Sequence, residues 1–157
     1  MDMGTNIMRV LFVCVANVNR SQIAEAIFNR TSKKNTGFSA GLAANPRGML
    51  LKQAHNDKEG DYPPILPMKE LGYDLSRKRV KRLNRKIAES ADKIVFIFNK
   101  RKHQNDIPKY LKDFPDIEFW DVHSIRKGIS FEEYCALERK RIKAIRSRVK
   151  KLVGKIG

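Results

Sequence analysis

Two runs of apolar residues without polar alternation dominate the hydrophobic pattern of the chain. Residues 9–15 and 93–98 consist largely of β-branched, aromatic and aliphatic side chains, a composition typical of strands that are buried on both faces. Residues 38–41 resemble the end of a further short strand, and residues 117–120, Ile-Glu-Phe-Trp, favour another. The pattern therefore predicts strands in these four segments.

Apolar residues at helical spacing follow the first run and also occur near the end of the chain. Residues 21–30 and 131–154 carry apolar side chains at intervals of three or four positions. A shorter helical pattern at residues 66–71 stops at Gly72, a common residue at helix ends. Residues 42–62 show only turn signals such as Asn-Pro. Strands that alternate with helices are typical of an α/β fold with a largely parallel sheet.

Length and composition favour one globular domain over residues 1–157. A chain of 157 residues with 41% hydrophobic and 32% charged residues has the usual size of a domain and the usual composition of a soluble protein. Its longest apolar run is shorter than the roughly 20 residues that span a bilayer, and no secretory signal is recognisable. Two cysteines cannot form a disulfide framework. We therefore expect a cytoplasmic protein without membrane contact.

The net charge of +16 is unusual for a chain of this length. Lysine and arginine number 33 against 17 acidic residues, and two segments without any acid, residues 77–86 and 139–155, hold seven and nine of these cations. A field of this sign attracts polyanions such as nucleic acid or phosphorylated protein. Because no nucleic-acid-binding module accompanies the two segments, we interpret them as solvated helix faces, for which contact with nucleic acid would be non-specific.

The segment Cys14-Val-Ala-Asn-Val-Asn-Arg20-Ser21 lies between the first predicted strand and the first predicted helix. Successive backbone N–H groups in such a loop form a concave nest for an oxyanion, and the helix N-terminus adds further donors. Arg20 can grip two phosphate oxygens with its planar fork, and a thiolate at Cys14 is a strong nucleophile toward phosphorus. Elsewhere in a chain this spacing would indicate only a buried thiol and a surface cation. The flanking strand and helix favour the chemical interpretation.

Several segments resemble, in order, the low-molecular-weight protein tyrosine phosphatases and their arsenate-reductase relatives. The matching segments are Val10-Leu-Phe-Val-Cys14, Arg20-Ser-Gln-Ile-Ala-Glu-Ala26, Ser39-Ala-Gly41 and Leu71-Gly-Tyr-Asp-Leu-Ser76. The resemblance extends over residues 8–153 and implies a flavodoxin-like, three-layer α/β fold with a four-stranded parallel sheet in the order 2-1-3-4. The active site would lie at the first strand–helix loop, where open α/β sheets bind ligands.

The resemblance implies roles for the residues of this loop. Cys14 would be the nucleophile, Arg20 would bind the phosphate and stabilise the transition state, and Ser21 would donate a hydrogen bond to the thiolate. Asn17 would hold the loop in shape through a hydrogen bond with Ser39, since asparagine tolerates the left-handed conformation that such a loop needs. The residues expected to surround the phosphate are Val15, Ala16, Asn17, Val18 and Asn19. No cofactor is implied, and no metal is expected because the three histidines are not at ligand spacing.

The chain departs from the family pattern at three places. Ala16 stands where the family usually has glycine, and Asn19 where it often has a second cysteine. The family's general acid is an aspartate in an Asp-Pro pair, which would fall at Ser124-Ile125, but the sequence contains no Asp-Pro. Asp121 and His123 lie nearby and are the possible substitutes for this acid, whose loss typically lowers the rate by ~10²–10⁴-fold.

Three functions fit these residues. The first is hydrolysis of phosphotyrosine or small aryl phosphate monoesters through a phosphocysteine intermediate, with inorganic phosphate, vanadate and sulfate as competing anions. The second is a module that binds phosphate or phosphoprotein with little turnover, which the missing aspartate favours. The third, arsenate reduction, needs further thiols, and the other cysteine, Cys135, is expected to be packed within the last helix. Four tyrosines are candidates for contact with an aryl ring: Tyr62, Tyr73, Tyr110 and Tyr134.

Overall fold

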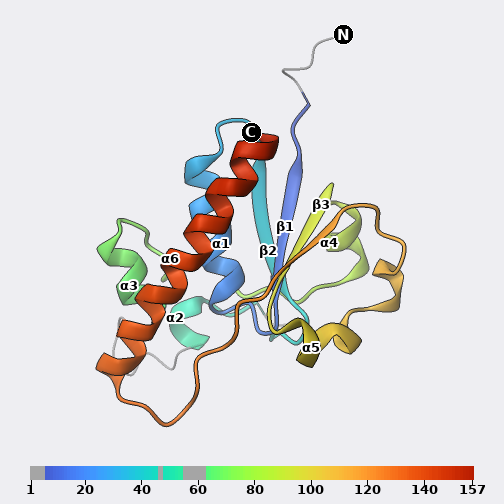
Figure 1. Cartoon of the computed structure of the whole chain (residues 1–157). Coiled ribbons are helices and arrows are strands. Elements are labelled where there is room, and N and C mark those ends of the chain that lie inside the picture. The colour runs from blue at the N-terminus through green and yellow to red at the C-terminus, as the bar shows by residue number, and fades with distance from the viewer. Residues whose placement is uncertain (1–5, 46–47, 55–62) are drawn as a thin grey trace.

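Four parallel strands form the centre of the structure, a computed structural model that describes residues 6–45, 48–54 and 63–157 (Figure 1). The order in the sheet is β2-β1-β3-β4, and each neighbouring pair is parallel. The strands are β1 (Arg9–Cys14), β2 (Thr36–Gly41), β3 (Lys93–Ile97) and β4 (Ile117–Trp120). The predicted sheet order 2-1-3-4 is therefore confirmed.

Helices cover both faces of this sheet and complete the three layers of the predicted flavodoxin-like fold. Figure 1 shows α1 (Arg20–Thr31), α3 (Ile65–Glu70) and α6 (Phe131–Ile156) on one side of the sheet. The short helices α4 (Arg85–Glu89) and α5 (Lys100–His103) lie on the other side. Helix α2 (Leu51–Ala54) and the 3₁₀ turns Gln104–Asp106 and Lys109–Leu111 complete the described elements.

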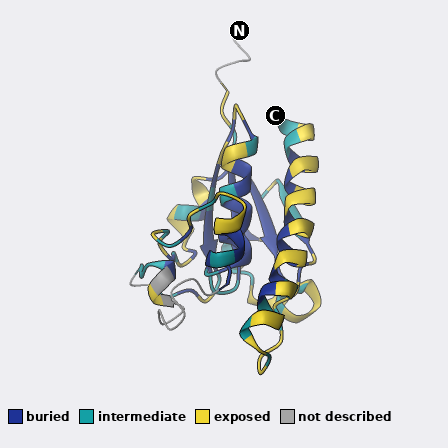
Figure 2. Cartoon of the chain, turned by 90° about the vertical axis from the view of Figure 1, so that its left-hand side faces the viewer, coloured by how far each residue is buried: buried dark blue, intermediate teal, exposed yellow. Residues whose placement is uncertain are grey.

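Successive side chains of β1 enter two separate cores. Val10 and Phe12 pack into a cluster with residues of α1 and α6, whereas Leu11 and Val13 pack into a cluster on the face of α4. All four are fully buried, and Figure 2 shows the sheet as a buried layer between partly exposed helices. Because both faces are covered, the strands show no polar alternation in the sequence.

The basic segment 77–86 is largely not helical, which corrects its interpretation as a helix face. Its backbone pairs instead with the end of β2 and with residue 50, through parallel pairing of Arg82 with Gly41 and antiparallel pairing of Arg79 with Leu50. The amide of Gly41 donates to Lys81 O at 2.8 Å, and the amide of Leu83 donates to Gly41 O at 2.9 Å. Because these backbone amides and carbonyls bond to other segments, they are not available for hydrogen bonds within a helix. The segment is therefore mostly extended up to the start of α4.

The second basic segment, 139–155, does form a solvated helix face. It lies within α6, and eight of its nine cations are exposed, with Arg141 as the buried exception. Figure 2 shows the exposed outer face of this helix. Within the described residues no helix combines the length and the apolar character needed to cross a membrane.

Candidate functional site

The loop between β1 and α1 lies at the carboxyl end of the sheet, where β1 has a neighbour on each side. Cys14 is the last residue of β1, and its side chain is 2% exposed. Its Sγ lies 2.9 Å from the hydroxyl of Ser21 in the first turn of α1. The backbone amide of Asn17 donates to the same sulfur at 3.3 Å. The fold therefore surrounds this thiol with hydrogen-bond donors.

Asn17 shapes the loop from a fully buried position. Its backbone has a φ of 58°, the left-handed conformation expected from the sequence. Its side-chain amide donates to Ser21 Oγ at 2.7 Å and to Ser39 Oγ at 3.0 Å, which confirms the predicted contact. Its Oδ1 accepts from the backbone amide of Lys81 at 2.8 Å. Asn17 thus ties the loop to α1, to β2 and to the segment before α4.

Two further buried residues of α1 support the loop, and the sequence analysis assigned no role to them. Gln22 donates to Asn17 O at 3.2 Å and to Asn17 Oδ1 at 3.0 Å. Glu25 accepts a 2.8 Å hydrogen bond from the hydroxyl of Ser39 and pairs with Lys78 at 3.2 Å. Both are buried in α1 together with the apolar residues Ile23, Ala24, Ile27 and Phe28. A polar residue among such apolar positions was the signal that could have identified them.

Gly41 at the end of β2 allows the loop to lie directly against the sheet. The amide of Leu42 donates to Cys14 O at 2.9 Å and that of Ala43 to Val15 O at 2.8 Å. A Cβ at Gly41 would lie 2.7 Å from both Asn17 N and Val15 O. Glycine is required here by the close approach of two backbones.

Arg20 begins α1 and is 7% exposed. Its Nη1 donates to the backbone oxygen of Val122 at 2.8 Å, across 102 residues of chain. Burial lowers the pKa of Arg20, the nearby Cys14 acts to raise it, and Arg141 acts to lower it. Because an arginine stays protonated in proteins, this side chain supplies a fixed positive charge beside the thiol.

A second cation, Lys81, lies near the same thiol. Burial lowers the pKa of Lys81, whereas Glu25 and Cys14 act to raise it. Its Nζ donates to Arg79 O at 2.8 Å. This lysine comes from the basic segment 77–86, so part of that segment contributes positive charge to the site.

Asp121 and His123 lie in the segment after β4 and flank the residue that contacts Arg20. Their side chains pair with each other at 2.9 Å and are 64% and 57% exposed. They line a cavity of about 560 Å³ together with Asn99, Lys100, Arg101 and Gln104. The buried residue between them, Val122, presents its carbonyl to Arg20. Ser124 and Ile125, where the family acid would fall, follow directly along the chain.

Other residues considered from the sequence differ in their relation to this site. Tyr73 stacks under Arg30 and Tyr110 under Arg85, whereas Tyr134 makes a minor contribution that raises the pKa of Arg20. Tyr62 and His55 lie outside the described residues. Cys135 is 3% exposed within α6, and burial raises the pKa of its thiol. Within the described residues no group of three potential metal ligands occurs.

Comparisons with solved structures find similar folds over nearly the whole chain. A low molecular weight protein tyrosine phosphatase from T. tengcongensis is 27% identical, with a TM-score of 0.63, and the alignment covers 94% of this chain and 99% of that one. An arsenate reductase from Archaeoglobus fulgidus is 23% identical, with a TM-score of 0.60 and coverage of 92% and 98%. The YwlE arginine phosphatase from Geobacillus stearothermophilus is 20% identical, with a TM-score of 0.65 and coverage of 94% of each chain.

A comparison with curated proteins found no match. A comparison with protein families gave a match to the low molecular weight phosphotyrosine protein phosphatases that extends over residues 9–156. This range runs from the first residue of β1 to the last residue of α6 and includes the loop described above. The chain therefore belongs to the low molecular weight phosphotyrosine protein phosphatase family.

Proposed function

We propose that this protein is a cysteine-dependent phosphatase that hydrolyses phosphotyrosine or other aryl phosphate monoesters. One observation carries the proposal. The Cys14 thiol lies under a loop that ends on the N-terminus of a 12-residue helix, with the Ser21 hydroxyl 2.9 Å away and the buried guanidinium of Arg20 nearby. Loop amides, a helix N-terminus and an arginine are the groups that bind a phosphate dianion.

In the first step, the thiolate of Cys14 attacks the phosphorus atom of the bound ester. A sulfur–phosphorus bond forms while the bond between phosphorus and the phenolic oxygen breaks. Arg20 and the amides of residues 15–20 neutralise the charge on the three phosphoryl oxygens, so the step requires no metal ion. The phenolate takes up a proton as it leaves.

Asp121 and His123 are the candidate donors of that proton. Each is adjacent in sequence to Val122, whose carbonyl accepts a hydrogen bond from Arg20, so the backbone that carries both is held by the proposed phosphate ligand. The 2.9 Å hydrogen bond between their side chains orients the imidazole ring of His123, and histidine is the residue that most often acts as a general acid in enzymes. We propose His123 as the donor and Asp121 as the residue that orients it.

In the second step, water attacks the phosphocysteine. The sulfur–phosphorus bond breaks, inorganic phosphate forms, and the thiolate returns to Cys14. The Ser21 hydroxyl donates to this sulfur and stabilises it as a leaving group. The side-chain amide of Asn17 donates a hydrogen bond to Ser21 Oγ at 2.7 Å. Because the oxygen accepts this bond, its own hydrogen is directed at the sulfur in both steps.

The other activities found among the similar structures fit these residues less well. Arsenate reduction requires a second thiol that can attack Cys14, but Cys135 is buried and its pKa is raised. Removal of phosphate from arginine requires a guanidinium group to lie beside the positive charges of Arg20 and Lys81, which repel it. Neither objection applies to a neutral phenol. The similar structures are phosphatases and an arsenate reductase, which gives no support to contact with nucleic acid.

Hydrolysis of p-nitrophenyl phosphate and of a phosphotyrosine peptide tests the proposal. The parent should hydrolyse both, Cys14→Ser should lose activity, and the matched variant Cys135→Ser should retain it. Inorganic phosphate and vanadate should inhibit competitively. If Cys14→Ser is as active as the parent, the proposal is wrong. If the parent binds the peptide without hydrolysing either ester, the protein is instead a phosphate-binding module.

A further inference from the structure

A buried ion pair in α6 lies next to residues 15–19, the loop that we propose to bind phosphate (the phosphate loop). Glu138 is 0% exposed and Arg141 is 8% exposed. Arg141 Nη2 donates to Glu138 Oε2 at 2.6 Å. Among the nine cations of residues 139–155, Arg141 is the buried one. The family resemblance in the sequence assigned no role to either residue.

Arg141 also contacts the segment after β4. Its Nη1 donates to the backbone oxygen of His123 at 3.1 Å. Arg20 donates to the backbone oxygen of the preceding residue, Val122, at 2.8 Å. Two guanidinium groups, one from α1 and one from α6, therefore hold consecutive carbonyls of the segment that carries both acid candidates.

Glu138 is the acidic residue in this cluster of charges. Burial raises the pKa of Glu138, while Arg141, Asn19 and Arg20 act to lower it. Its carboxylate therefore faces both guanidinium groups and a residue of the phosphate loop. Because a buried ion pair is often no more stable than an apolar replacement, stability alone gives little reason for this arrangement. A requirement for defined geometry explains it better.

We propose that Arg141, anchored by Glu138, is a positioning residue that fixes the segment after β4 relative to Arg20. Its planar fork is needed because one prong binds Glu138 and the other binds the carbonyl of His123. The ion pair thereby holds the proton donor of the reaction at a set distance from the phosphate. This inference rests on the proposed function at one point, which is that His123 or Asp121 protonates the leaving group.

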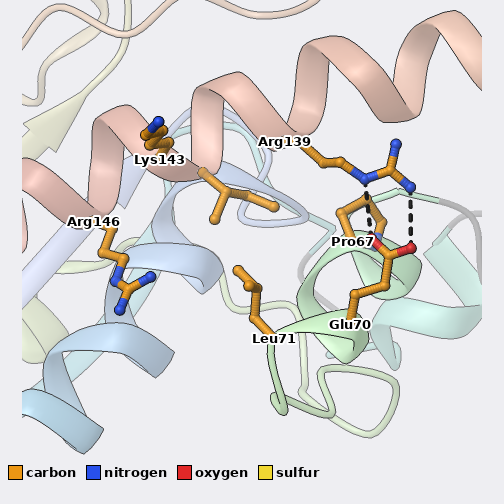
Figure 3. A pocket seen from close by; sticks show the side chains of 7 residues that line it. Pro67, Glu70, Leu71, Arg139, Lys143 and Arg146 are labelled. Carbon is orange, nitrogen blue, oxygen red and sulfur yellow. Dashed lines mark hydrogen bonds and ion pairs between the residues drawn. The ribbon is translucent and has the colours of Figure 1, made fainter.

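The same helix supplies a matched control pair, whose arginine lies two residues before Arg141 on the exposed side of α6. Arg139 binds Glu70 of α3 through both prongs, at 3.0 Å and 3.0 Å. Figure 3 shows this pair beside the apolar cleft that Pro67, Leu71 and Ile142 help to line. Arg139 is 50% exposed and Glu70 is 44% exposed. The pair resembles the buried one in its chemistry but does not contact the phosphate loop.

The test compares Arg141→Lys with Arg139→Lys. Lysine keeps the charge opposite the carboxylate but lacks the rigid planar fork that reaches Glu138 and the carbonyl of His123 at once. For Arg141→Lys we expect kcat for a phosphotyrosine peptide to fall between about tenfold and a hundredfold, the effect of a misplaced catalytic group. The rate with p-nitrophenyl phosphate should fall less because its leaving group needs little protonation, and competitive inhibition by phosphate should change little. Arg139→Lys should match the parent in all three measurements.

A second variant guards against misfolding, and a second measurement does not depend on activity. Glu138→Gln with Arg141→Gln removes both charges of the pair together, so neither member is left buried without its partner. It should fold, as judged by thermal unfolding, and show the same selective loss with phosphotyrosine. In Arg141→Lys, hydrogen exchange of the backbone amides in residues 121–130 should be faster than in the parent and in Arg139→Lys.

The outcomes separate this inference from the proposed function. If Arg141→Lys behaves as Arg139→Lys does, or if the double variant keeps full activity toward phosphotyrosine, Arg141 has no positioning role. An equal loss with both esters together with weaker inhibition by phosphate would also overturn it, because the effect would then be on the phosphate loop as a whole. If the parent hydrolyses neither ester, the proposed function fails, and the hydrogen-exchange comparison alone decides whether Arg141 fixes the segment.

Discussion

The substitution Gly41→Ala adds one methyl group at the point where β2 meets the phosphate loop. The new Cβ would lie 2.7 Å from Asn17 N, 2.7 Å from Val15 O and 2.8 Å from Ala16 C. All three contacts are with backbone atoms, so no side-chain rotation can relieve them. To reach the 3.4 Å of an ordinary contact, the loop must move by about 0.7 Å.

This displacement sets the size of the expected effect. A shift of about 1 Å in a catalytic group can lower the rate by ~10²-fold, so we expect kcat/KM to fall between about tenfold and a hundredfold. Overpacking of this kind also costs about 1–3 kcal/mol of folding stability. The assays are steady-state hydrolysis of p-nitrophenyl phosphate and unfolding in urea.

Two other glycines serve as controls. A Cβ at Gly37, in the same strand, would lie 2.9 Å from the ring of Phe28, so Gly37→Ala should lower stability and leave kcat/KM unchanged. A Cβ at Gly154 would meet no atom within 4 Å among the described residues. Gly154→Ala should therefore raise stability by up to about 1 kcal/mol through helix propensity. If Gly41→Ala is as active as the parent, the added methyl group displaces β2 and not the loop. That result would refute the reasoning.

Three further predictions concern the site. Iodoacetate at neutral pH should alkylate Cys14, with protection by phosphate, while Cys135 should react only in alkaline solution because burial raises its pKa; equal rates for the two thiols, measured by peptide mass spectrometry, would contradict this. Arg20→Lys should lower kcat/KM by ~10²–10³-fold, since the charge remains but the fork is lost; a rate near that of the parent would reduce Arg20 to a simple cation. His123→Gln should lower the rate with phosphotyrosine more than the rate with p-nitrophenyl phosphate, because only the poorer leaving group needs a proton donor, and Asp121→Asn should show a smaller loss of the same kind because His123 loses its hydrogen-bond partner. If neither variant alters the ratio of the two rates, the acid comes from another residue.

The sequence alone determined the parts of this protein that are built from adjacent residues. An apolar run of six residues, a short loop and an amphipathic helix follow one another within residues 9–31, and this order places Cys14, Asn17, Arg20 and Ser21 around one point. Strand–loop–helix geometry depends on local hydrogen bonding and periodicity, which the sequence displays directly. The sheet order followed from the family resemblance and was confirmed.

The tertiary structure decided what surrounds that point. The tertiary structure brings Gly41 against the loop, lets the charges of Lys81 and Cys14 interact and joins Arg20 to Val122, and these segments are far apart in the chain. The basic segment 77–86 was interpreted as a helix face because its composition does not reveal that its backbone pairs with Gly41 and Leu50. Likewise, the composition of α6 gives no sign that one arginine among nine is buried against Glu138. Such contacts depend on how the helices and strands pack against one another. This packing is specified by the shape of the whole core and not by any local sequence pattern.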